Sequence, residues 1–216
     1  NLIIAVGQRN ATGLSINGSA ELMMYNNTVI YGAQNSGSIT SSEAISHSAT
    51  GETYIYGNIF YGIGASPRGM RLYNEDIVYN GDYNLSYSDN QEDLASELNG
   101  ENNYYYYEDE NGYDYYWPPE PGFINPPYSY IGPNNGYISM SDLDVNLQSN
   151  SICLDGGMPS HVFNDLDGTR NDMGVYGGSG LITNMDIFDF GTVTYLSEDR
   201  DTLTSVTKTF KFLNST

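Results

Sequence analysis

The sequence predicts an all-β fold in which short strands stack in parallel as a solenoid, and three observations lead to this prediction. The 216 residues include 21 Tyr and 24 Gly but 7 Lys and Arg together, and aromatic residues favour strands whereas Asn and Gly favour turns. Residues 24–32 (MYNNTVIYG) and 55–62 (IYGNIFYG) share one pattern, and short strands that recur at such intervals are typical of solenoids. Two-residue Asn-Gly turns between alternating strands, the mark of hairpins, are scarce.

The repeat predicts which residues of successive turns lie side by side. With an offset of 31 residues, Met24 falls on Ile55, Asn27 on Asn58 and Val29 on Phe60. A third, looser copy covers residues 72–81 (LYNEDIVYNG). Asn suits the bends because it tolerates the left-handed backbone region and can hydrogen-bond to its copy in the next repeat. The alternative fold is a β-sandwich of ordinary hairpins, which short strands would also permit.

The charge of the chain disfavours some partners. There are 27 Asp and Glu residues, and the formal net charge is −20, so we expect no nucleic-acid partner, because phosphate binding needs a basic surface. No window approaches the roughly 18 consecutive apolar residues of a membrane span. The single cysteine, Cys153, reads as a small buried apolar residue. With neither an initiator Met nor a signal peptide, the chain is expected to be part of a longer precursor.

The composition changes at about residues 99–136, which hold the Trp, an acidic cluster and most of the prolines. We expect a Tyr-rich insertion that leaves one turn of the solenoid and packs down through its aromatic rings. These rings either serve as a substitute core or stack on sugar rings. The glycan-binding candidates are Tyr105, Tyr107, Tyr113, Tyr115, Tyr116 and Trp117. The candidates for a calcium ion in the same insertion are Asp109, Glu110 and Asp114.

The loop DLDGTRNDMGVYGG, residues 165–178, combines acidic residues, an arginine and glycines. We favour a structural cap in which Arg170 bridges Asp165, Asp167 or Asp172 and the loop covers the exposed edge of the last turn. Gly168 supplies backbone freedom. The alternative is a Ca²⁺ site built from the three aspartates. Arg170 argues against calcium because a guanidinium already supplies the countercharge.

Four motifs near the C-terminus resemble the last coils of bacterial secreted right-handed parallel β-helix proteins of the pectate-lyase-like superfamily. The resemblance implies β-helix coils over residues 1–180, with the cap at 150–180, in a secreted or cell-surface bacterial protein. Ser151 is followed directly by Ile152 without the usual proline, and Gly156 replaces Ala. The matching segments are GFINP (122–126), NGYISM (135–140), NSICLDGG (150–157) and the 165–178 loop.

Residues 181–216 are similar to the opening strands of an immunoglobulin-like module of the Hydin type. Such a module needs about 100 residues, so the resemblance implies that the chain ends inside the module. The matching positions are Phe190, Gly191, Val193, Lys208, Phe210 and Asn214.

Enzymes of the pectate-lyase-like superfamily cleave acidic polysaccharides with an Arg or Lys base beside calcium-binding carboxylates. The best candidates for this chemistry lie in SPRGMRLYNED (66–76) and are Arg68, Arg71, Glu75 and Asp76. Their alternative role is ordinary salt bridging on a solvated loop. His47 and His161 have no apparent partner and are expected at the surface.

Taken together, these patterns predict an extracellular structural or adhesive protein that contacts glycans or neighbouring subunits. An exposed solenoid edge would allow homo-oligomer assembly. The alternative is a polysaccharide lyase or a carbohydrate-binding module that acts on a glycan with calcium. The enzyme question stays open, with the balance against activity.

Overall fold

A computed structural model gives the fold, which divides into two compact units, Asn1–Ser179 and Gly180–Thr216. The sequence placed this division at residue 180. The structure describes residues 1–8, 10–19, 21–34, 41–64, 67–73, 78–88, 98–105, 107–108, 115–116, 118–130, 136–178, 189–199 and 202–211.

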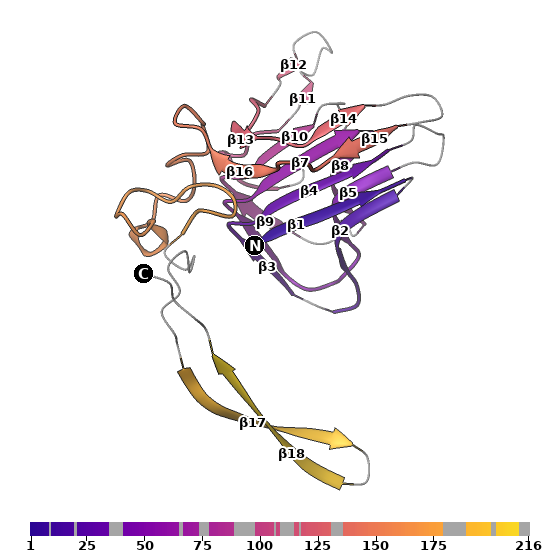
Figure 1. The fold of residues 1–216 in the computed structure, drawn as a ribbon, viewed down its shortest axis with the longest axis vertical. Helices are drawn as coiled ribbons and strands as arrows, with labels where there is room; N and C mark the ends of the chain where they lie inside the picture. Colours follow the sequence, from indigo (N-terminus) through magenta and orange to yellow (C-terminus); the bar gives the residue numbers. More distant parts are fainter. Residues whose placement is uncertain are drawn as a thin grey trace. The chain divides into compact units, whose positions relative to one another are not determined.

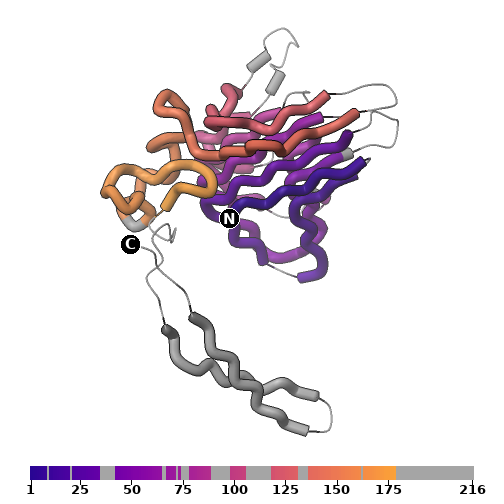
Figure 2. Tube along the Cα trace, in the orientation of Figure 1, coloured from indigo at the N-terminus to yellow at the C-terminus, as the bar shows by residue number. Residues whose placement is uncertain are grey.

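The first unit is built on three parallel sheets that the chain visits in turn (Figure 1). Each sheet receives one strand from each of the first three repeats, β10 adds a fourth strand to one of the sheets, and Figure 2 traces the chain through them. Sheet 1 contains β1 (Leu2–Gly7), β4 (Thr28–Ala33), β7 (Ile59–Gly64) and β10 (Leu85–Ser88). Sheet 2 contains β2 (Asn10–Ile16), β5 (Ser41–His47) and β8 (Pro67–Leu72), and sheet 3 contains β3 (Leu22–Tyr25), β6 (Thr53–Tyr56) and β9 (Tyr79–Asp82).

The strand register confirms the predicted repeat. Met24 pairs with Ile55 and Val29 with Phe60, as the offset of the two segments requires. All strand pairs from β1 to β10 are parallel. The antiparallel sandwich is therefore wrong for these strands. The third copy was misplaced at 72–81, because the register pairs Thr53 with Tyr79 and the copy begins there.

A column of asparagines joins the repeats at the bend that precedes sheet 1. The side-chain oxygen of Asn58 accepts hydrogen bonds from the backbone N (2.9 Å) and the side-chain Nδ2 (3.0 Å) of Asn27. Asn84 does the same for Asn58, and Asn103 for Asn84. The residues before three of these asparagines have positive φ: Asn26 (50°), Gly57 (67°) and Tyr83 (56°). The bend therefore repeats one backbone geometry in each turn, and Asn satisfies its buried polar groups.

The two central strands of sheet 1, β4 and β7, are covered on both faces, and every one of their residues is buried. Val29 and Phe60 point into the interior between the three sheets, where they pack with residues of sheets 2 and 3. Ile30 and Ile59 belong to a second apolar cluster, together with residues that come much later in the chain. These later residues are Phe123, Val145, Cys153 and Met173. Burial of Cys153 agrees with the sequence expectation.

We call residues 118–178 the covering segment, because they supply this outer layer over sheet 1. Their strands are antiparallel, so they do not continue the parallel repeats as the sequence implied. In Figure 1 the hairpin of the segment lies beside β7, and it packs against that strand. The segment contains β13 (Phe123–Asn125) paired with β16 (Asp144–Leu147), β14 (Tyr128–Tyr130) paired with β15 (Tyr137–Ser139), and the 3-10 helix η1 (His161–Phe163).

The start of the Tyr-rich insertion also differs from the expectation. Residues 98–105 still belong to the repeats, because Leu98 bridges Tyr79, and Tyr104 bridges Leu85, both in parallel. Within the insertion, β11 (Tyr107–Glu108) and β12 (Tyr115–Tyr116) form an antiparallel pair. The excursion from the repeats therefore begins after residue 105.

The second unit contains one described antiparallel pair, β17 (Asp189–Asp199) and β18 (Thr202–Lys211). A hairpin is compatible with the first strands of an immunoglobulin-like module, but many β proteins contain one.

Candidate functional site

The predicted cap loop is held by its aspartates through backbone amides. The Asp165 carboxylate accepts hydrogen bonds from the N–H groups of Asp172 (3.0 Å) and Gly178 (2.6 Å), so it joins two distant points of the loop. Asp167 accepts from the backbone N (2.9 Å) and the hydroxyl (2.7 Å) of Thr169. Gly168 follows with φ of 87°, a value that glycine adopts without strain.

Arg170 does not bridge the aspartates, contrary to the sequence expectation. Its Nε donates to the carbonyl of Gly157 at 2.7 Å, and its second guanidinium donor reaches the same oxygen. The guanidinium carbon lies 5.2 Å from the ring centroid of Tyr83. A guanidinium can bond a carbonyl and stack on a ring at the same time. Arg170 therefore connects the loop to a bend of the repeats.

The loop lies along the side of the repeats. The sequence analysis had instead placed it over the exposed edge of the last turn. Asn171 donates to the side chain of Asn26 at 3.1 Å, and the N–H of Gly174 donates to the carbonyl of Gly57 at 2.7 Å. Both acceptors belong to the left-handed bend residues before the asparagine column. The loop is therefore a lateral strap, a name we use for residues 165–178.

The strap offers a poor calcium site. Burial raises the pKa of Asp165, and burial together with repulsion from Asp165 raises the pKa of Asp172 to about 6. The oxygens of Asp165 already accept two N–H groups. Across the described ranges, no group of three or more His, Cys, Asp or Glu side chains is arranged to hold a metal ion. The other calcium candidates, Asp109, Glu110 and Asp114, lie outside the described residues.

One of the candidate lyase residues, Arg71, forms an ion pair on sheet 2. Arg71 on β8 donates to the buried Glu43 of β5 at 3.1 Å, and its guanidinium carbon lies 4.8 Å from the ring centroid of Tyr73. The hydrogen bond to Glu43 raises the pKa of Arg71. An arginine whose protonated form is favoured in this way is a poor general base. Arg68 pairs with Glu43 in the strand register, and Glu75 and Asp76 lie outside the described residues.

His47 is fully buried, so its expected surface position is wrong. Its Nε2 lies 3.3 Å from the Thr53 hydroxyl, and its ring meets the Tyr79 ring edge-on at 5.5 Å between centroids. Burial lowers the pKa of this histidine. It serves as a core residue of the repeats. His161 is exposed, as expected.

The structure describes four of the six glycan-binding candidates of the Tyr-rich insertion. Tyr105 is half-buried. Tyr107 and Tyr116 pair in the backbone of β11 and β12, with Tyr115 beside them. Tyr113 and Trp117 lie outside the described residues.

An exposed set of tyrosines on β14 and β15 was missed by the sequence reasoning. Tyr128, Tyr130 and Tyr137 are 60%, 51% and 50% exposed. The ring centroids of Tyr130 and Tyr137 lie 5.7 Å apart in a stacked arrangement, and those of Tyr128 and Tyr137 lie 6.1 Å apart. Ile138, the residue after Tyr137, packs into the outer cluster of sheet 1. We call these three residues the tyrosine face. The alternation in YSY and YIS was the signal that could have identified it.

No helix within the described ranges is long and apolar enough to cross a membrane. Comparisons of the chain with protein-family models, curated proteins and solved structures give no match. The resemblance to pectate-lyase-like proteins therefore rests on the sequence motifs, and the structure supports it to the level of an all-β chain of stacked parallel strands.

Proposed function

We propose that the chain is part of a secreted bacterial cell-surface protein with a structural or adhesive role, and that its tyrosine face contacts neutral glycans. In this proposal the repeats are coils of a right-handed parallel β-helix, since parallel crossover connections are right-handed in about 98% of cases. The second unit begins an immunoglobulin-like module that extends the protein from the surface.

The observation that carries the proposal is the exposed tyrosine face on a hairpin that is itself packed against the repeats. Ile138 anchors the inner side of the hairpin, so the outer tyrosines are presented with little loss of freedom on binding. Flat aromatic rings stack on the apolar faces of sugars, and the phenol hydroxyls bond sugar hydroxyls. A net charge of −20 repels polyanions, which favours neutral chains.

Affinity gel electrophoresis with neutral polysaccharides tests the glycan contact. Replacing both Tyr130 and Tyr137 by Ala should weaken retention about tenfold, because two stacking surfaces are lost. Tyr176→Ala, at another exposed tyrosine, is the matched control and should leave retention unchanged. Retention of the double variant equal to that of the unaltered protein would refute the glycan contact, as would stronger retention by anionic polysaccharides.

Assembly through a sheet edge is a second candidate function. The strands β1, β2 and β3 are the first strands of their sheets, and no described strand pairs with their outer edges. Leu2 and Ile4 on β1 are exposed beside this edge. Unpaired strand edges can add a strand of another subunit. Sedimentation measurements should detect oligomers as the concentration rises, and a chain that stays monomeric at high concentration would exclude this role.

A further inference from the structure

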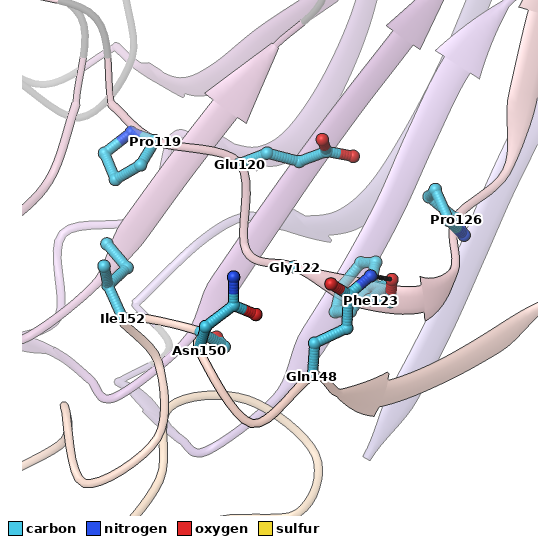
Figure 3. Close-up of a pocket in the computed structure, with 9 residues that line it drawn as sticks. Pro119, Glu120, Gly122, Phe123, Pro126, Gln148, Asn150 and Ile152 are labelled. Carbon is cyan, nitrogen blue, oxygen red and sulfur yellow. Dashed lines mark hydrogen bonds between the residues drawn. The ribbon is translucent and has the colours of Figure 1, made fainter.

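A pocket of about 370 Å³ opens in the covering segment (Figure 3). One side comes from the chain around β13 and the other from the turn after β16. Pro126 lines the pocket, and β14 begins two residues later. The volume lies at the small end of the range of about 300–1,000 Å³ that small-molecule sites occupy. A pocket of this volume suits a ligand of one or two six-membered rings.

Two polar side chains of the pocket, Glu120 and Gln148, are each held by a hydrogen bond to a neighbouring residue. The Glu120 carboxylate is held by the hydroxyl of Tyr61, which donates to its Oε1 at 3.1 Å. The Gln148 Nε2 donates to the carbonyl of Phe123 at 2.8 Å, which leaves the amide oxygen of Gln148 for a ligand. Figure 3 shows the Asn150 amide pointing into the space between Glu120 and Gln148. The pocket thus offers a fixed carboxylate, a fixed amide oxygen and an amide that both donates and accepts.

The apolar walls complete the site. Pro119 and Pro126 lie on opposite sides of the pocket (Figure 3), whereas the ring of Phe123 is buried beneath it in the outer cluster of sheet 1. Proline rings offer C–H surfaces that match the apolar face of a sugar ring. Most small-molecule sites combine such walls with a few placed polar groups.

Hydrogen bonds join the two sides of the pocket before any ligand arrives. The backbone N of Gln148 donates to the carbonyl of Gly122 at 2.8 Å, so the two sides are joined directly. The hydroxyl of Ser151 donates to the carbonyl of Pro121 at 2.5 Å and accepts from the N–H of Cys153 at 3.0 Å. Gly122 has φ of 73°, which few other residues adopt without strain. A preformed site loses little entropy on binding.

We propose that this pocket binds one unit of a neutral pyranose, with Glu120 and Gln148 accepting its hydroxyl protons and Asn150 bonding a further oxygen. None of the described residues that line the pocket is basic, and Glu120 repels uronates, sulfates and phosphates. The inference rests on the proposed glycan contact and assigns it a second, separate subsite. The tyrosine face would hold a chain by stacking, whereas the pocket would select a residue by its hydroxyls.

Ligand-observed saturation-transfer NMR with methyl pyranosides of glucose, galactose, mannose and N-acetylglucosamine tests the pocket in the full chain, with galacturonate as the anionic probe. At least one neutral pyranoside should give a signal at millimolar concentration, and galacturonate should give none. Asn150→Ala should weaken binding about fivefold, which corresponds to one lost hydrogen bond. Ser149→Ala, at the exposed neighbour outside the lining, is the matched control.

Glu120→Gln sharpens the test because it keeps the acceptor for Tyr61 and removes the charge. This variant should admit galacturonate, since the repulsion is gone, while neutral binding changes less than in Asn150→Ala. The proposal is overturned if no neutral pyranoside binds, if galacturonate binds the unaltered protein as well as the neutral sugars do, or if Asn150→Ala binds as well as Ser149→Ala.

The Tyr130 and Tyr137 double variant separates the two sites. It should keep the pyranoside signal while it loses retention on polysaccharide. If the pocket fails but the polysaccharide result holds, the subsite is wrong and the proposed function stands. If retention is also absent, the glycan contact itself is wrong.

Discussion

The repeats and the covering segment are both held by hydrogen bonds, but they use different kinds of residue pattern. In the repeats, the bond from Asn27 to Asn58 recurs from Asn58 to Asn84 with nearly the same distances. In the covering segment each bond is individual, such as Arg170 to Gly157 or Ser151 to Pro121. A repeated environment selects the same residue at each turn, whereas an irregular layer selects a different solution at each position.

The largest expected effect comes from breaking the repeated bond. Asn58→Ala leaves the backbone N and the side chain of Asn27 without their acceptor, and it removes donors to the carbonyls of Met24 and Tyr56. Each buried unsatisfied group costs about 1–3 kcal/mol. We expect the free energy of unfolding, measured by denaturant titration, to fall by about 3–5 kcal/mol.

Asn99→Ala is the matched control for this change. Asn99 donates to Asn80 at 3.1 Å at an exposed position and accepts one longer bond, at 3.3 Å, from the part-buried N–H of Gly81. Water replaces the exposed bond and one backbone N–H loses its acceptor, so the expected loss is about 1 kcal/mol, well below that of Asn58→Ala. Equal losses for the two variants would show that burial of the column does not matter.

A smaller effect is expected where the strap meets the repeats. Gly174 has φ of 84°, and a Cβ there would lie 2.7 Å from both Ile59 Cδ1 and Thr28 Oγ1. Gly168 has φ of 87° with nothing within 4 Å of the added atom. Gly174→Ala should cost about 2–4 kcal/mol and Gly168→Ala about 1 kcal/mol, because the second variant carries the backbone strain alone. Thermal unfolding of both variants measures the difference, and equal costs would mean that the strap moves freely off the repeats.

The smallest expected effect is electrostatic. Burial raises the pKa of Asp172 from 3.8 to about 6. A carboxyl that binds its proton more tightly in the folded state stabilises the fold at low pH, and this contribution is lost as the pH rises from about 4 to about 6. Asp172→Asn retains the acceptor for the N–H of Asp155. It should raise the free energy of unfolding at pH 7 by about 1 kcal/mol, after allowance for solvent screening.

Denaturant titration at a series of pH values measures this effect, and Asp167→Asn is the control variant in that series. Hydrogen bonds from Thr169 lower the pKa of Asp167, so Asp167→Asn should destabilise the fold at pH 7 instead. A gain of stability in Asp172→Asn that persists unchanged at pH 3 would contradict the titration of Asp172 as its cause.

Much of the repeat region could be predicted from the sequence, because the same local pattern recurs and each copy tests the others. Met24 over Ile55 and the bends at Asn27 and Asn58 followed from one offset. The third copy failed because the interval changes from 31 residues between Asn27 and Asn58 to 26 between Asn58 and Asn84. A change in loop length moves a copy without changing its pattern.

The candidate site was predictable to a much smaller extent. His47 lies in a polar stretch of sequence, yet the neighbouring repeats bury it completely. Arg170 is surrounded by aspartates along the chain, but its partners are Gly157 and Tyr83. Proximity in sequence was a poor guide to contact here, because the strap packs on bends formed far earlier in the chain.

The sequence by itself determined that the chain is all-β and that residues around Asn27, Asn58 and their neighbours stack in parallel, since strand and turn propensities and a periodic pattern act locally. Tertiary structure alone decided that Phe123 folds back over sheet 1 and that Tyr128, Tyr130 and Tyr137 stay outside. The bond from Asn171 to Asn26 spans 145 residues. Contacts at that separation depend on the shape of the whole first unit, which no short stretch of sequence encodes.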